Sequence, residues 1–179
     1  MIFELSRRAR LASHVFAVAS FALLTGCIRS SAPILTDAQP LLGEGPRLQF
    51  YALHDGAAYE PTEENFRWRD DRYVPTGGTA NDVGPFTLHA FEGADLIAQS
   101  IRPGHPSEYA VVRKLADGTY LVIAIDEDDA DAATRNSFCE KDPGASCRVT
   151  TREAVLAFAR ATAAKSHSTG GLAVLMAEQ

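Results

Sequence analysis

The stretch YAVVRKLADGTYLVIAI, residues 109–125, contains the pattern that decides the fold class. Two runs rich in β-branched and aromatic residues, 109–115 and 119–125, flank the dipeptide Asp117-Gly118. An acidic residue before glycine suits the positive φ angles that tight hairpin turns require. The pattern therefore predicts two antiparallel strands joined by a short turn.

The same pattern recurs upstream. Two further pairs of runs have this form: 47–53 with 57–60 around Asp55-Gly56, and 85–91 with 94–101 around Glu92-Gly93. Residues 66–74 predict a fourth hairpin around Asp70-Asp71, with Phe66 and Trp68 on one face because side chains alternate along a strand. The first two-thirds of the chain after residue 46 thus reads as hairpins.

The last third changes to a helical pattern. Thr150 and Glu153 match the capping box at a helix start, and the residues behind them, 155–163, carry an apolar side. Residues 172–176 fit either a final strand or a loose tail. The predicted fold class is α+β, a mainly antiparallel β-sheet built from hairpins with one C-terminal helix packed on it.

The N-terminus has the order of a secretion signal. Arg7, Arg8 and Arg10 precede an apolar run at 11–24, and Leu24-Thr25-Gly26-Cys27 follows. The run is shorter than the roughly 20 residues that a transmembrane helix needs, which favours a signal-peptide core. An ordinary N-terminal helix with a buried cysteine is the alternative.

Residues 1–27 resemble the lipobox signal peptide of bacterial lipoproteins. The resemblance implies cleavage between Gly26 and Cys27 and a diacylglyceryl group on the Cys27 sulfur, which anchors the protein to a membrane without spanning it. Because Ile28, not aspartate, follows the cysteine, the resemblance favours the outer membrane, facing the periplasm. Soluble secretion is the minor alternative.

These patterns predict three parts of the chain: a signal peptide at 1–26, a lipidated cysteine with a flexible tether at 27–44, and one globular β-rich domain at 45–179. Removal of Glu4 and the three arginines at positions 7, 8 and 10 changes the formal net charge from −6 to −8. Such an acidic chain argues against nucleic acid as a partner. The expected partners are the membrane, through the lipid, and an envelope protein or small-molecule ligand.

Cys139 and Cys147 are the two cysteines left for pairing, and an even pair in an oxidising compartment predicts a disulfide. Their spacing is not C-x-x-C, so a structural bond is favoured over a redox-active one. The acidic run 126–131 departs from the EF-hand pattern and also fits the N-terminal end of a short helix through Asn136. No cofactor and no metal site are predicted.

The candidate binding residues are Phe66, Arg67, Trp68, Arg69 and Tyr73, because aromatic and arginine side chains are enriched at interfaces. Alternation along the strand favours the aromatics as core and the arginines as surface.

The predicted function is a non-enzymatic binding module anchored in the cell envelope. The alternative is an envelope hydrolase with a carboxylate and histidine site assembled in space, near Asp126, Asp128 and His105. A pocket that holds two of those side chains within hydrogen-bond reach would favour the hydrolase.

Overall fold

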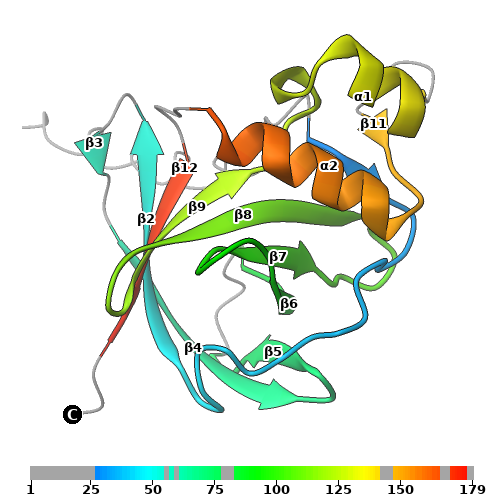
Figure 1. Ribbon diagram of the computed structural model, residues 1–179. Helices are drawn as coiled ribbons and strands as arrows, with labels where there is room; N and C mark the ends of the chain where they lie inside the picture. Colours follow the sequence, from blue (N-terminus) through cyan, green and yellow to red (C-terminus); the bar gives the residue numbers. More distant parts are fainter. Residues whose placement is uncertain are drawn as a thin grey trace, which may run out of the picture.

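Eight antiparallel strands close into a barrel in the computed structural model, which describes residues 27–54, 57–58, 61–77, 83–141, 147–165 and 170–176 (Figure 1). The barrel strands are β2 (Arg47–His54), β4 (Thr62–Arg69), β5 (Arg72–Pro75), β6 (Phe86–Ala90), β7 (Leu96–Ser100), β8 (Ser107–Ala116), β9 (Thr119–Ala124) and β12 (Gly170–Leu175). Each barrel strand pairs with the next one along the chain, and β12 closes the ring by pairing with β9 and β2.

The predicted architecture, a sheet with one C-terminal helix, is wrong. The strands form a closed barrel, and the described residues contain two short α-helices, α1 (Ala132–Phe138) and α2 (Arg152–Ala163). Residues 172–176, for which the sequence fits either a strand or a tail, lie largely in the strand β12, which closes the barrel through pairs such as Leu175 with Leu48. Nothing local in the sequence marks that pairing, because its partners lie more than a hundred residues apart in the chain.

The hairpins themselves are confirmed. β6 pairs with β7 and β8 pairs with β9, and the turn glycines Gly93 and Gly118 have φ angles of 62° and 72°. The β4–β5 turn uses Asp70 and Asp71 at φ 51° and 56°, which suits a two-residue hairpin loop. β2 also pairs with the short strand β3 (Ala57–Ala58), although the turn at 55–56 and residues 59–60 of the predicted run lie outside the described residues.

Two hydrophobic cores share the barrel wall. The side chain of Val112 lies in the core inside the barrel, and that of Val111 lies in the outer core between the wall and α2, because successive side chains point to opposite faces. Figure 1 shows α2 lying across the outside of the barrel over β8. Its buried side contributes Val155 and Phe158 to the outer core.

The start of α2 lies one residue later than predicted. Thr151 is the N-cap, and its hydroxyl oxygen accepts a hydrogen bond of 3.2 Å from the backbone N–H of Ala154. Glu153 is then the second helical residue instead of the third, so the capping box predicted with Thr150 does not form.

The segment predicted as a tether, residues 27–44, lies against the domain. The short strand β1 (Arg29–Ser30) pairs with β8 and with β11 (Cys147–Arg148), while Ile28 and Leu35 are buried in the outer core. In Figure 1 this blue segment begins beside β11 and follows the outside of the barrel to the start of β2. The chain therefore makes structural contacts from Cys27 onward.

The remaining elements lie between β9 and α2. They are the 3₁₀ helix η1 (Glu127–Asp129), the helix α1 and the short strand β10 (Glu140–Lys141), which pairs with β11. Across the part of the chain that the structure describes, no helix has both the length and the apolar composition to cross a bilayer.

Candidate functional site

The β4–β5 hairpin separates its aromatic and arginine side chains onto two faces, as alternation predicts. Phe66 is only 3% exposed inside the barrel, and the ring of Trp68 packs against that of Tyr73 with centroids 4.9 Å apart. Arg67 and Arg69 lie on the outer face and are exposed. Of the candidate binding residues, the two arginines are therefore the ones at the surface.

Tyr73 also connects the chain before β2 to the core inside the barrel. It is fully buried, and its hydroxyl accepts a hydrogen bond from the backbone N–H of Leu42 and donates one to the carbonyl of Gly43. Burial raises the pKa of Tyr73, so the hydroxyl stays protonated and able to donate. The aromatic face of the hairpin thus has a structural role.

The acidic run 126–131 supplies helix caps. Asp126 Oδ1 accepts a hydrogen bond of 2.8 Å from the backbone N–H of Asp128 at the start of η1, and Asp131 Oδ1 accepts one of 2.7 Å from Thr134 at the start of α1. His105 is exposed in the turn between β7 and β8. Among the described residues, no hydrogen bond or ion pair joins His105 to Asp126 or Asp128.

A buried polar network that the sequence analysis missed joins β6, β7 and the segment before β2. His89 is 1% exposed; its Nδ1 lies 3.0 Å from Asp37 Oδ1, and its Nε2 lies 2.8 Å from the hydroxyl of Thr87. Gln99, which is 0% exposed, continues the network with its Nε2 3.2 Å from that hydroxyl. Arg152 of α2 reaches the same Asp37 oxygen at 2.8 Å.

The network has one consistent set of donors and acceptors when His89 is neutral. Gln99 donates to the Thr87 hydroxyl, the hydroxyl donates to His89 Nε2, and His89 Nδ1–H donates to the Asp37 carboxylate. Burial lowers the pKa of His89, which favours this neutral form, while the Arg152 hydrogen bond lowers the pKa of Asp37 to about 2.

A carboxylate, a histidine and a hydroxyl in this order also occur in acyl-transfer enzymes. Here the Thr87 hydroxyl is buried on the wall beneath residues 34–39 and accepts a hydrogen bond from Gln99. A substrate carbonyl would have to displace that segment to reach it. The arrangement therefore fixes the segment to the barrel wall.

Gln99 carries most of this fixation. Its Oε1 accepts hydrogen bonds from the backbone N–H groups of Ile34 and Leu35, and its Nε2 donates to the carbonyl of Leu35. One side chain thus satisfies three backbone groups of a segment that has no strand partner at these residues. The only sequence signal is Thr87 and His89 on one face of a strand, because their partners come from distant positions.

Cys27 is the first residue of the chain that the structure describes. It forms an isolated bridge with Asp126 and is 2% exposed. Burial, together with the negative charges of Glu108 and Asp126, raises the pKa of the Cys27 thiol to about 12. In this environment the thiol does not form the reactive thiolate near neutral pH in the folded chain.

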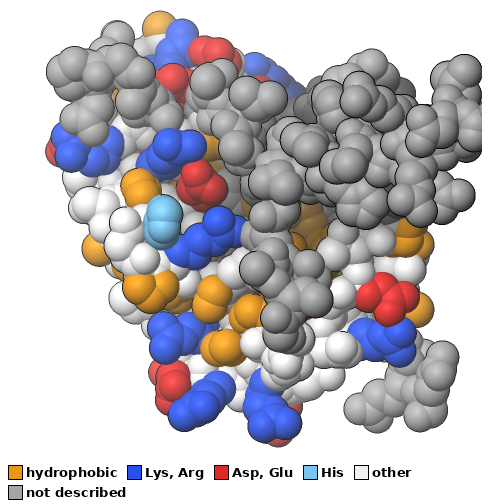
Figure 2. Space-filling model, turned by 180° about the vertical axis from the view of Figure 1, so that it is seen from behind, with side chains coloured by type: hydrophobic (Ala, Val, Ile, Leu, Met, Phe, Trp, Pro, Cys, Tyr) orange, Lys and Arg blue, Asp and Glu red, His pale blue; other side chains and the backbone are white. Residues whose placement is uncertain are grey.

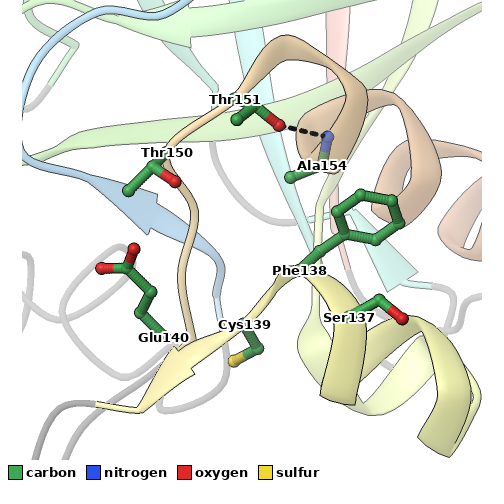
Figure 3. Close-up of a pocket in the computed structure, with 7 residues that line it drawn as sticks. All are labelled: Ser137, Phe138, Cys139, Glu140, Thr150, Thr151 and Ala154. Atoms are coloured by element: carbon green, nitrogen blue, oxygen red, sulfur yellow. Dashed lines mark hydrogen bonds between the residues drawn. The ribbon is translucent and has the colours of Figure 1, made fainter.

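The predicted disulfide between Cys139 and Cys147 is confirmed. It joins the C-terminal end of α1 to β11, and Figure 3 shows Cys139 among the residues that line a pocket between α1 and the start of α2. The pocket has a volume of about 290 Å³ and is also lined by Ser137, Thr150 and Ala154. Cys139 is half-buried there, whereas Cys147 is 1% exposed.

Glu127 of η1 completes this cluster. Its Oε2 lies 3.7 Å from Cys139 Sγ, and one ligand atom from each of Glu127, Cys139 and Cys147 lies within 4.8 Å of the other two. The sequence predicts the pairing of the two cysteines but not the carboxylate, which η1 brings to them from twelve residues upstream of Cys139. Comparison of the chain with family models, curated proteins and solved structures finds no match.

Proposed function

We propose that the chain is the precursor of a lipid-anchored protein of the bacterial cell envelope, and that its barrel domain is a binding module. One observation supports this proposal most strongly. The closed barrel is built from strands between residues 47 and 175, all of which lie downstream of Cys27, the residue that the lipobox pattern marks for lipidation. Cleavage before Cys27 leaves the whole barrel intact.

The strand that follows Cys27 bears on how the anchored protein is oriented. Because β1 belongs to the sheet, no free spacer separates the lipidated residue from the barrel. In Figure 1 the start of the blue segment beside β11 and the β4–β5 hairpin lie at opposite ends of the molecule. An anchor at Cys27 would direct that hairpin away from the bilayer.

The outer face of the hairpin is the surface that we assign to binding. Arg67 and Arg69 are exposed there on a rigid pair of strands, and Arg72 lies directly opposite Arg69. Like charges that face each other across strands destabilise a sheet, and Asp70 Oδ2, 3.4 Å from Arg69 Nε, offsets part of this repulsion. Figure 2 shows the face behind Figure 1, where acidic and basic side chains are interspersed with small hydrophobic groups. An envelope protein with an acidic surface suits the arginines.

Two measurements test the anchor. Metabolic labelling with palmitate should mark the wild-type chain and not the Cys27→Ser variant, and only the wild type should remain with membranes after a high-salt wash. The alternative for Cys27, an ordinary buried cysteine, predicts an unlabelled chain whose first 26 residues are still present by mass spectrometry. That result would refute the anchor.

Pull-down from crosslinked envelopes tests the binding surface. The double variant Arg67→Glu and Arg69→Glu should lose proteins that the wild type captures, because charge reversal opposes an acidic partner. Arg160→Glu is the matched control, since this exposed arginine of α2 lies elsewhere on the molecule. If both variants capture the same proteins as the wild type, the hairpin is not the binding surface.

A further inference from the structure

We propose that the reduced form of the Cys139–Cys147 pair, together with Glu127, binds a thiophilic divalent cation of the zinc class. This inference goes beyond the proposed function and does not depend on whether Cys27 is lipidated. It rests on the arrangement of the three side chains and on the pocket that reaches one of the two sulfurs.

The distances fit a tetrahedral ion. Zinc bonds to sulfur at about 2.3 Å and to carboxylate oxygen at about 2.1 Å, which places tetrahedral ligand atoms roughly 3.6 to 3.8 Å apart. Glu127 Oε2 and Cys139 Sγ are 3.7 Å apart, close to that expectation. The Cα atoms of the cysteines are 5.1 Å apart, so both sulfurs stay within reach of one ion once the bond between them is open.

The elements that carry the ligands are held in place independently of the disulfide. Asp126 caps η1 next to Glu127, and β11, which carries Cys147, pairs with both β1 and β10. Reduction therefore leaves the three side chains near one another. Two thiolates with one carboxylate favour zinc over calcium or magnesium, which prefer oxygen ligands throughout.

The pocket offers a route to the reduced state. A dithiol can attack Cys139 Sγ, which lines the pocket, but not Cys147 Sγ, which is buried. Attack forms a mixed disulfide on Cys139 and releases Cys147 as a thiolate that takes up a proton. The second thiol of the reagent then frees Cys139, so the dithiol leaves as a disulfide after giving two electrons and two protons.

Binding of the ion displaces the two thiol protons into solution. Three protein ligands leave one coordination position for water or a small ligand, and this position would face the side of the cluster where the pocket opens. The pair would thus exist in two states, an oxidised state without the ion and a reduced state with it.

The test uses the full chain in detergent with Cys27→Ser, which leaves Cys139 and Cys147 as its only thiols. After reduction with dithiothreitol and anaerobic removal of the reagent, titration with Zn²⁺ should show one ion per chain and a rise in the melting temperature. Co²⁺ should give a thiolate-to-cobalt charge-transfer absorption. The oxidised chain should show neither response.

Two variants distinguish a site formed by all three side chains from binding of the ion by the two thiols alone. Glu127→Ala should weaken Zn²⁺ binding by roughly tenfold or more through the loss of a ligand. Glu140→Ala, which removes a nearby exposed carboxylate paired with Arg148, should change the affinity by less than about twofold. Equal binding by the oxidised chain, equal affinity for the Glu127→Ala variant, or binding without a rise in melting temperature would each overturn the proposal.

Discussion

The replacement of Gln99 by leucine tests whether one buried amide fixes the N-terminal segment to the barrel. Gln99 is 0% exposed and makes four hydrogen bonds, three of them to the backbone of Ile34 and Leu35. Leucine has a similar volume but no polar atoms, so the replacement leaves those backbone groups without partners. The same change leaves the Thr87 hydroxyl without its donor.

The expected cost follows from burial. An unsatisfied buried donor or acceptor costs about 1 to 3 kcal/mol. Leu35, which supplies two of the three backbone groups, is buried, whereas Ile34 is half-buried and partly open to water. We therefore expect Gln99→Leu to lower the free energy of unfolding by about 2 to 4 kcal/mol. Gln49→Leu is the control, because the hydrogen bonds of Gln49 go to surface side chains, and should cost under about 1 kcal/mol.

Urea melts measure the global cost, and amide hydrogen exchange locates it. The N–H groups of Ile34 and Leu35 should exchange faster in the Gln99→Leu variant, while those in the middle of β8 should change only in line with global stability. A loss below about 1 kcal/mol with unchanged exchange at both residues would refute the assignment of Gln99 as the main fixation point.

Three further changes test other parts of the structure. Burial lowers the pKa of His89 below its ordinary 6.5, so below that pH the unfolded chain binds a proton that the folded chain does not, and the free energy of unfolding should fall. Urea melts at two pH values should show a smaller fall for His89→Gln than for the wild type. Equal falls would contradict this. Trp68→Ala should cost about 3 kcal/mol in denaturant melts and Arg67→Ala under about 1 kcal/mol, whereas similar costs would place the indole outside the core. Asp71→Gly should stabilise the chain by about 1 kcal/mol, because Asp71 has a φ of 56°, and a lower melting temperature would argue against strain in that turn.

The sequence predicts the hairpins of this fold well because their determinants are local. Each turn is marked by residues such as Asp117-Gly118, and each strand by β-branched and aromatic runs next to that turn. Closure of the barrel depends instead on β12, a glycine-rich strand near the C-terminus whose partners are β2 and β9. Its sequence fits a tail as well as a strand, since the pairing energy comes from distant chain segments.

The N-terminal segment shows a second limit of sequence reasoning. Ser30, Pro33 and Pro40 give residues 27–44 the composition of a linker, yet the segment is fixed by side chains that lie far away in the chain. The amide of Gln99 replaces the strand partner that the segment lacks near Leu35. The local composition indicates that this segment has no strand partner, but it does not show that a distant side chain takes the place of one.

In the candidate sites, too, local features can be predicted from the sequence and contacts between distant residues cannot. The pairing of Cys139 with Cys147 follows from cysteine count, and the inward side of Phe66 and Trp68 follows from strand alternation. Glu127 reaches the cysteines only because Asp126 begins a 3₁₀ turn at that point. The sequence shows the residue types in such a cluster, but the short helical elements decide which of them meet.

The position of Cys27 links the fixation of the N-terminal segment on the barrel wall to the orientation that a lipid anchor would give the barrel. A lipid on a flexible tether lets a domain sample many orientations, whereas the proposed lipid on Cys27, which lies two residues before the paired strand β1, would transmit the orientation of the bilayer directly to the barrel. In that arrangement the Gln99 contacts oppose peeling of the segment from the wall. Loss of those contacts, as in Gln99→Leu, would free only the chain around Ile34 and Leu35, because Cys27 and β1 lie upstream and keep their own sheet pairings. The proposed lipid would therefore still hold the β4–β5 hairpin in a fixed direction in this variant, and only loss of the β1 pairing would release it.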